Sequence, residues 1–281
     1  MRARQTHTFG KMPRGRRIVV DLLTMIAPAA VPCFLIRDID VTWANGLKDR
    51  LKAEGSKITV TAILLKAIAV AQKNHPASRT ELVPFGRTVT YEDIVAGFTV
   101  ERMMRDEDTV FFGEIESPHE KSISRIAEEL TQYVEDTPSS IAPLALQNIY
   151  SGLPYFLRRT ILFVGQCVPA MRLKCQKATF GLTTLGKYGI SSVLSPCICT
   201  STFGIGTIED RTVVINNRVE IRPRMTITYN YNAKVIDGQA AANFFRDVCD
   251  LMEGGLAEQI TTEERELSIE TGRRHLQTAV R

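Results

Sequence analysis

The sequence predicts an α+β fold, and three patterns point to it. Residues 122–135 place apolar side chains at helical spacing with charges opposite. Residues 213–221 read as a β-hairpin around Asn216-Asn217. Extended apolar runs separate the helical segments along the chain. At 281 residues, with 44% hydrophobic and 23% charged residues, the chain is long enough to bury a large core.

Each element in the first half has its own signal. Residues 34–41 are expected to form a strand, and residues 41–52 a short helix with Leu47 and Leu51 facing inward. Thr59 or Thr61 can cap a long helix that runs to Gln72, and its dense apolar surface predicts burial. Residues 88–102 then favour strands.

The second half is expected to deliver a loop to one end of a strand. Residues 224–232 form that strand, and residues 238–253 form a helix that ends at Gly254-Gly255. Between the strand and the helix lies the sequence YNYNAKVIDGQAAAN, residues 229–243, which carries more functional information than any other stretch of this chain.

Composition narrows the functional classes. The net charge of +4 comes largely from a basic arm in the first 17 residues, which we expect to be solvated or packed on a neighbouring subunit, with no nucleic-acid partner. The apolar runs 18–36 and 161–171 contain prolines and polar residues and predict core or pocket walls, with no membrane partner. Six cysteines lack a Cys-x-x-Cys pair, so we expect reduced thiols in a cytoplasmic protein and no metal; Cys197 and Cys199 would share one face of a strand.

The segment 229–243 resembles the active-site signature of the catalytic domain of 2-oxoacid dehydrogenase acyltransferases, and its His-x-x-x-Asp-Gly core is shared with chloramphenicol acetyltransferase. Asn232 stands at the Asp position of that signature, Lys234 at the Arg position, and Asp237-Gly238 are intact. The position of the general-base histidine holds Ala233. A methyl group cannot accept a proton, so the resemblance implies an acyltransferase site without its base.

Three further blocks are similar to the same family in the same order. They are Arg16–Val20 with 31–42, the helical stretch 58–76, and the strand 180–186, written FGLTTLG here. The resemblance implies a two-layer sandwich of the chloramphenicol acetyltransferase type, a mixed sheet covered by helices. It also implies a homotrimer with active sites between subunits and an acyl-CoA, such as acetyl-CoA, as co-substrate.

The resemblance also assigns roles. Thr183 matches the serine whose hydroxyl stabilises the tetrahedral oxyanion, although a strand threonine often has no function. Asp237 matches the residue that pairs with a basic group and holds the loop, and Lys234 or an N-terminal arginine could be that group. Asp237 also suits a plain helix cap, and the two roles are compatible. None of His7, His75, His119 and His275 is an obvious substitute for the missing base.

Three explanations of Ala233 remain open. We favour an inactivating replacement of the family histidine, because the surrounding site residues persist. A natural relative that has lost transfer activity and binds a ligand or partner is the second explanation. A different base is the third.

The expected organisation is a basic arm at 1–13, a catalytic domain at 14–255 and a charged extension at 256–281. Within the domain, the apolar insertion 137–177 is either an extra helical pair or a lid for a partly apolar acceptor.

The absence of a preceding lipoyl domain argues against membership of a dehydrogenase complex. The expected function is acetyl transfer to a hydroxyl of a small natural product such as a tetronate. The alternatives are a dihydrolipoamide acyltransferase core and a non-catalytic ligand-binding or interaction protein.

Overall fold

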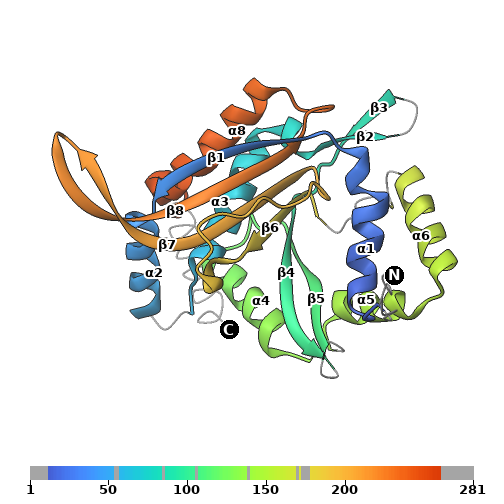
Figure 1. Cartoon of the computed structure of the whole chain (residues 1–281). Coiled ribbons are helices and arrows are strands. Elements are labelled where there is room, and N and C mark those ends of the chain that lie inside the picture. Colours follow the sequence, from blue (N-terminus) through green and yellow to red (C-terminus); the bar gives the residue numbers. More distant parts are fainter. Residues whose placement is uncertain are drawn as a thin grey trace, which may run out of the picture.

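A six-stranded mixed sheet organises the protein (Figure 1). The computed structural model describes residues 12–53, 57–83, 86–104, 107–137, 140–168, 171 and 178–260. The strand order is β1-β8-β7-β6-β4-β5; β6 is parallel to both of its neighbours and the other pairs are antiparallel. The strands are β1 (Pro32–Asp40), β4 (Val95–Met104), β5 (Glu107–Glu116), β6 (Phe180–Thr184), β7 (Ser201–Ile215) and β8 (Arg218–Asn232).

Helices cover one face of this sheet, as expected for a two-layer sandwich (Figure 1). This layer contains α2 (Thr42–Ala53), α3 (Val60–Asn74), α4 (Ile123–Glu135) and α8 (Gly238–Asp250). Three more helices gather at the β5 end of the sheet, namely α1 (Arg16–Met25), α5 (Ala142–Gly152) and α6 (Tyr155–Cys167). A small hairpin of β2 (Thr80–Val83) and β3 (Arg87–Thr90) stands apart from the main sheet.

Alternation along the strands separates the core face from the opposite face. On the core face, Phe203 of β7 stacks on Tyr229 of β8 with ring centroids 4.9 Å apart, and Phe244 of α8 meets Tyr229 edge-on at 5.3 Å. All three side chains are buried. Residues that alternate with the core-facing residues along each strand lie on the opposite side of the sheet, which we call the front face. They are Thr99 of β4, Gly181 and Thr183 of β6, Thr202 of β7, and Thr228 and Asn230 of β8.

Several sequence predictions are confirmed at the level of single residues. Thr59 caps α3 by accepting a hydrogen bond from the Ala62 amide at 3.2 Å. Asn216 and Asn217 both have left-handed backbones, with φ of 49° and 61°, as a tight hairpin turn requires. Gly254, with a φ of 140°, breaks the helix that begins at Gly238, and a further helical turn at 256–260 follows it.

Other predictions need correction. The two strands of the hairpin, β7 and β8, are longer than expected, and their turn projects away from the rest of the molecule (Figure 1). Cys197 and Cys199 lie in irregular chain before β7 and not in a strand, and the Cys197 thiol donates to the Cys199 carbonyl at 3.2 Å. The arm residues 1–11 and the tail residues 261–281 lie outside the described residues. None of the helices in the described part of the chain has the length and hydrophobicity needed to cross a bilayer.

Candidate active site

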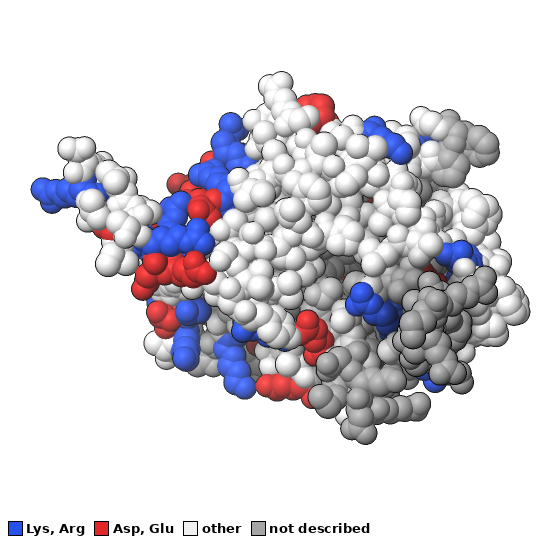
Figure 2. Space-filling model, in the orientation of Figure 1, with Lys and Arg blue, Asp and Glu red and all other residues white. Residues whose placement is uncertain are grey.

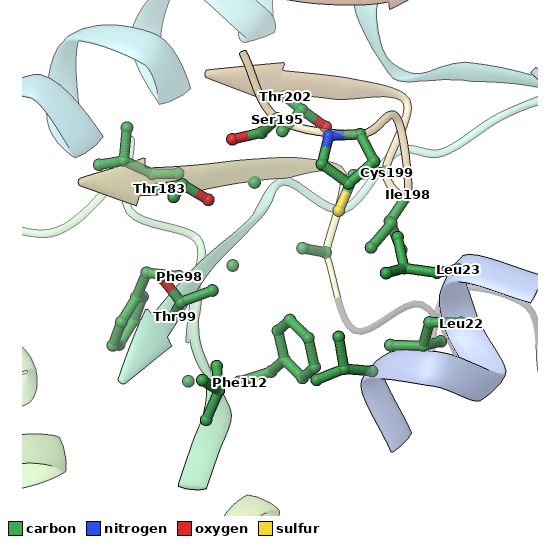
Figure 3. Close-up of a pocket in the computed structure, with 18 of the residues that line it drawn as sticks. Leu22, Leu23, Phe98, Thr99, Phe112, Thr183, Ser195, Ile198, Cys199 and Thr202 are labelled. Carbon is green, nitrogen blue, oxygen red and sulfur yellow. The ribbon is translucent and has the colours of Figure 1, made fainter. Parts of the chain in front are cut away.

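A pocket of about 310 Å³ opens on the front face beside Thr183 (Figure 3). Helix α1, strands β4 to β7 and the chain before β7 contribute its walls. Most lining side chains are apolar, and Arg16 alone among the described lining residues is charged. The volume lies at the low end of the range for small-molecule sites, which are mostly apolar with a few polar groups. The apolar walls are formed by Val19, Leu22, Leu23, Phe98, Val110, Phe112, Leu182, Val193, Leu194, Pro196 and Ile198.

Residues 189–199, which we call the roof segment, lie flat on the front face. Thr228 and Asn230 of β8 donate side-chain hydrogen bonds to the carbonyls of Val193 and Ser195, the second at 2.7 Å. Space for this close approach comes from glycine: a Cβ on Gly204 would lie 2.1 Å from the Val193 carbonyl oxygen. The roof segment is therefore held by the sheet, and its Val193–Ile198 part closes one side of the pocket.

The pocket also contains a thiol, which could in principle act as a nucleophile. Cys199 points its sulfur toward the pocket (Figure 3). Burial raises the pKa of the Cys199 thiol, and it raises that of Cys197 to about 12. Both groups stay protonated near neutral pH, and the thiolate is the nucleophilic form. Cys199 is thus a lining group and a poor candidate for a covalent acyl carrier.

Helix α1 forms one wall of the pocket, and a buried ion pair fixes it in place. Arg158 of α6 donates from Nε to Asp21 Oδ2 of α1 at 2.7 Å, and the Tyr150 hydroxyl of α5 donates to the same oxygen at 3.2 Å. Both charged side chains are buried. On the pocket side, α1 presents Val19 and Leu23. The α5–α6 pair therefore supports the pocket through α1.

The described part of the insertion 137–177 contains the helices α5 and α6, and none of its described residues lines this pocket. The outer side of α6 exposes large apolar side chains, including Phe156 and Phe163.

The loop after β8 carries the residues that the sequence marks as catalytic. Ala233 is exposed, and its amide donates to the Val31 carbonyl at 2.9 Å. Asn232 Oδ1 accepts from the amides of Val31 and Lys234 at 3.0 and 3.1 Å, so it shapes this turn. Lys234 donates to the Ala29 carbonyl at 2.9 Å.

Asp237 acts as a helix cap in this chain. Its Oδ1 accepts from the amides of Gln239 and Ala240, both at 2.9 Å, at the start of α8. Lys234 donates to the Ala29 carbonyl, and the contacts of the Asp237 carboxylate in the described structure are those of a helix cap. A Cβ on Gly238 would make an ordinary 3.7 Å contact with the Tyr231 hydroxyl, so lack of space does not require glycine there.

Thr183 and Ala233 are far apart within one chain. Thr183 is aligned with Gly204 of β7, which is aligned with Thr228 of β8, and Ala233 follows Thr228 by five positions. Two strand spacings amount to about 10 Å and five extended residues to about 16 Å, so the separation is roughly 15–20 Å. One copy of the chain cannot bring both residues to the same substrate atom.

The described histidines make structural contacts. His75 ends α3, and its Nε2 lies 2.7 Å from Asp247 Oδ2 of α8, with the ring packed against Phe244. Burial lowers the pKa of His119, whose Nε2 lies 3.5 Å from Glu120. Neither residue lines the pocket. His7 and His275 lie outside the described residues.

Sequence reasoning missed three contributors to this site. Thr202 and Asn230 are ordinary strand residues in sequence, and only the strand register aligns Thr202 with Gly181 on one side and with Asn230 on the other. Asp21 did carry a signal, because a carboxylate inside the apolar run 18–26 needs a buried partner. Its partner, Arg158, is 137 positions away and could not be named from the sequence. No cluster of three or more metal-ligating side chains occurs within the described ranges.

The fold and its front-face pocket define an acyltransferase-type α+β protein. The chain belongs to the 2-oxoacid dehydrogenases acyltransferase (catalytic domain) family, which matches residues 5–142 and 172–259. The unmatched stretch, 143–171, contains α6 and nearly all of α5. The helical pair that anchors α1 therefore lies almost wholly outside the residues that match the family.

Two of the similar curated proteins are succinyltransferase components of 2-oxoglutarate dehydrogenase complexes. The dihydrolipoyllysine-residue succinyltransferase component of the 2-oxoglutarate dehydrogenase complex from Bartonella vinsonii subsp. berkhoffii is 23% identical over 258 residues, 86% of this chain and 53% of that protein. Its counterpart from Rickettsia bellii is 25% identical over 260 residues, 86% and 54% of the two chains. This chain spans about half the length of these relatives.

Solved structures agree on the fold. The cubic core of the pyruvate dehydrogenase multienzyme complex matches with a TM-score of 0.67 at 20% identity, over 89% of this chain and 93% of that one. Azotobacter vinelandii dihydrolipoamide acetyltransferase gives the same four values. Chloramphenicol acetyltransferase matches with a TM-score of 0.50 at 13% identity, over 86% and 96% of the two chains. The predicted two-layer fold is confirmed.

Proposed function

We propose that this protein is the scaffold of an acyl-CoA-dependent O-acyltransferase that works as a homotrimer. Its acyl group is acetyl, and its acceptor is a hydroxyl of a small, largely apolar natural product such as a tetronate. In this form, Ala233 occupies the position of the general base. The observation that carries the proposal is the Thr183 hydroxyl at the edge of an apolar pocket, on the strand that the family resemblance assigns to the oxyanion.

The reaction needs little from the protein beyond positioning and charge stabilisation. The acceptor oxygen attacks the thioester carbon, and its proton passes to a base. The tetrahedral oxyanion then collapses, the carbon–sulfur bond breaks, and the proton returns to the CoA sulfur as the ester leaves. Thr183 would donate to the oxyanion, and the apolar walls would strengthen that hydrogen bond by excluding water. A base at position 233 would contribute about 10²–10⁴-fold.

A second copy of the chain would complete this site. Within one chain Thr183 and Ala233 are separated by roughly 15–20 Å, so the base and the oxyanion donor must come from different copies. The front of the molecule is largely uncharged in the middle of the view, and its charged residues gather toward the β7–β8 hairpin (Figure 2). It exposes apolar side chains that a neighbouring copy could cover, among them Val31, Phe34, Ile36, Tyr188, Ile190 and Leu194.

One comparison supports the residue assignment. The Azotobacter vinelandii acetyltransferase was studied for the role of a serine, a histidine and an asparagine in its catalytic mechanism. That histidine and asparagine are four positions apart, as Ala233 and Asp237 are here. The serine precedes them by a similar separation to that between Thr183 and Ala233.

A dihydrolipoamide acyltransferase is the second candidate, favoured by the names of the curated relatives. A succinyl group would bring a carboxylate into the site, and the described pocket offers Arg16 at its edge as the one charged lining residue. A ligand-binding protein without transfer activity is the third candidate, and the exposed methyl group of Ala233 is consistent with it.

Acyl transfer by the Ala233→His variant tests the proposal. Acetyl-CoA and succinyl-CoA are each offered with dihydrolipoamide and with a panel of apolar alcohols, and release of free CoA thiol is followed. We expect acetyl transfer to an alcohol that is at least ten times faster than in the parent chain. Transfer to dihydrolipoamide alone would favour the second candidate. CoA binding without transfer in either protein would favour the third.

A further inference from the structure

The outer side of α6 is an apolar surface that faces away from the protein. Phe156 is 71% exposed and Phe163 is 63% exposed, whereas Leu162 is buried in a cluster with Leu22 of α1. The expectation of core or pocket walls at 161–171 therefore holds for Leu162 and is wrong for Phe163. Two neighbouring rows of the helix, each spaced i, i+4, i+7 and i+11, are exposed and form what we call the α6 surface. The rows are Phe156, Thr160, Phe163 and Cys167, and Leu157, Ile161, Val164 and Val168.

The α6 surface lies at a different edge of the molecule from the contact proposed between copies. The strand order places β1 and β5 at opposite edges of the sheet, and α6 lies at the β5 edge, outside α1 (Figure 1). The exposed residues Val31, Phe34 and Ile36 belong to the β1 edge. Contact between copies at β1 therefore does not account for the exposed side chains of α6.

The α6 surface offers almost no hydrogen-bonding groups. Thr160 carries its one hydroxyl, and that hydroxyl donates to the Phe156 carbonyl of the same helix at 2.9 Å. Cys167 adds a thiol, which is a weak donor. A protein interface carries about one hydrogen bond per 100–200 Å², whereas lipid asks for none. Phenylalanine and aliphatic side chains along one helix face are typical of helices that lie in a lipid surface.

The chain that builds this part of the molecule is positively charged. Residues 137–208, which include α5 and α6, contain six Lys or Arg and no Asp or Glu. Residues 1–20, which lead into α1, also contain six Lys or Arg and no Asp or Glu. The first carboxylate of the chain, Asp21, is buried and accepts from Arg158, so this pair presents no net charge to the outside.

Three arginines lie near the start of α6. Arg14 donates to the Asn148 carbonyl of α5 at 3.3 Å. Arg17 donates to the Ser151 carbonyl, close to the end of α5, at 3.1 Å. Arg159 belongs to α6 itself. Two copies joined through this surface by a two-fold axis would bring like charges together, whereas a negatively charged surface is complementary to it.

We propose that the α6 surface docks the protein on an anionic phospholipid membrane. The phenylalanine and aliphatic side chains enter the boundary between headgroups and acyl chains, and the arginines near the start of α6 meet the lipid phosphates. Helix α6 lies in the plane of the surface and does not span the bilayer. The sequence-based expectation of no membrane partner concerned spanning segments, and this docking differs from it. The inference is independent of acyl transfer, because it uses neither Thr183 nor Ala233.

Vesicle flotation of the full chain tests the docking without any acyl donor. Vesicles of equal parts phosphatidylglycerol and phosphatidylcholine should bind the protein. Vesicles of phosphatidylcholine alone should bind it at least about 5-fold more weakly, because they lack the charge that attracts the arginines. Added sodium chloride should weaken binding to the anionic vesicles, because salt screens the attraction.

Replacements of exposed apolar side chains locate the contact. Phe156→Ser and Phe163→Ser should each lower the partition coefficient about 10-fold, since each removes one ring from the lipid. Both rings are exposed, so the melting temperature without vesicles should match that of the parent. Val219→Ser and Ile221→Ser are the matched controls, because these side chains are 71% and 72% exposed on the β7–β8 hairpin. The control variants should bind vesicles like the parent.

Two further variants report charge and depth. Arg159→Gln should lower binding to the anionic vesicles about 5-fold, whereas Arg218→Gln, on the exposed hairpin, should not change it. Phe163→Trp should emit at shorter wavelength when anionic vesicles are added, because the indole enters an apolar environment. Val219→Trp should show no such shift.

Several outcomes would overturn the proposal. The first is parental binding by a chain that carries both Phe156→Ser and Phe163→Ser, and the second is equal binding of the parent to neutral and anionic vesicles. The third is a parent chain that binds no vesicles. If, in addition, the parent were larger than the double variant by light scattering, the α6 surface would be assigned to a second copy of the chain. An acidic protein that binds the parent and not the double variant, with no vesicle binding, would assign it to a protein partner.

Discussion

Arg158 Nε lies 2.7 Å from Asp21 Oδ2, and this buried pair joins α6 to α1. The two residues come from different parts of the family comparison: Asp21 lies in the matched domain, and Arg158 lies in the unmatched stretch 143–171. An added element thus fixes the wall that carries Val19 and Leu23 into the pocket. The insertion acts on the site through packing at a distance, which no local motif records.

Removing one member of this pair should be costly. Arg158→Met leaves the Asp21 carboxylate buried without its cation, and breaking such a pair typically destabilises a protein by about 3–5 kcal/mol. Chemical denaturation should show that loss. Arg159→Met is the matched control: Arg159 is half-buried, and its guanidinium carbon lies 4.9 Å from the Tyr155 ring centroid, a cation–π contact worth about 0.5–2 kcal/mol. If both variants lost a similar amount of unfolding free energy, the Arg158–Asp21 pair would not be the contact that anchors α1.

An imidazole at position 233 should increase the rate of acetyl transfer. Ala233→His should raise acetyl transfer by about 10²–10⁴-fold, the usual contribution of a general base. Because Ala233 is exposed in a single chain, the new side chain should not disturb the fold, and the melting temperature should be unchanged. Stopped assays with acetyl-CoA measure the gain. Lys234→His, one position along the same loop, is the control and should give no gain.

The sequence predicted the sheet-and-helix order because the relevant signals are local. The Thr59 cap, the Asn216-Asn217 turn and the Gly254 stop each depend on a few neighbouring residues. The candidate site was predicted at Thr183 and the 232–238 loop for the same reason, through contiguous motifs. The Thr202 end of the pocket depends on strand register across three strands, which contiguous sequence does not specify.

The Asp237 contacts show which part of a motif is local. The sequence placed Asp237 at the start of a helix and allowed both a cap and a pairing with Lys234 or an N-terminal arginine. The carboxylate bonds to the first free amides of α8, which are always present at a helix start. Lys234 reaches back to Ala29, a contact made possible by the turn before β1. Long-range geometry decided the partner.

Buried thiols should make the protein sensitive to alkali. Burial raises the pKa of both Cys197 and Cys249 from the ordinary 9.0 to about 12. A raised folded pKa means that the unfolded chain loses the proton first. The stabilising effect is therefore complete below about pH 9 and is lost as the pH rises toward 12. Urea unfolding across that window should show stability falling by up to about 1 kcal/mol per pH unit for each thiol.

Single replacements separate this effect from other alkaline titrations. Cys249→Ala should flatten the pH dependence in that window, even though the lost side chain lowers stability at every pH. Cys167 is exposed, so Cys167→Ala should leave the slope as it is in the parent. Identical slopes in all three proteins would assign the alkaline loss to other groups.

The Thr183 hydroxyl should matter for turnover more than for binding. In the Ala233→His background, Thr183→Ala should lower turnover by about 10²-fold with little change in acceptor affinity, because negative charge develops only in the transition state. Thr183→Ser should keep most of the activity, since serine supplies the same hydroxyl. Thr183→Val matches the threonine in shape and should behave like the alanine variant. If threonine stands here for strand packing alone, the order reverses: the valine variant turns over at the parental rate, and the serine variant is the one that loses stability. Turnover numbers and melting temperatures for the three variants, measured with one acceptor, decide between the two roles.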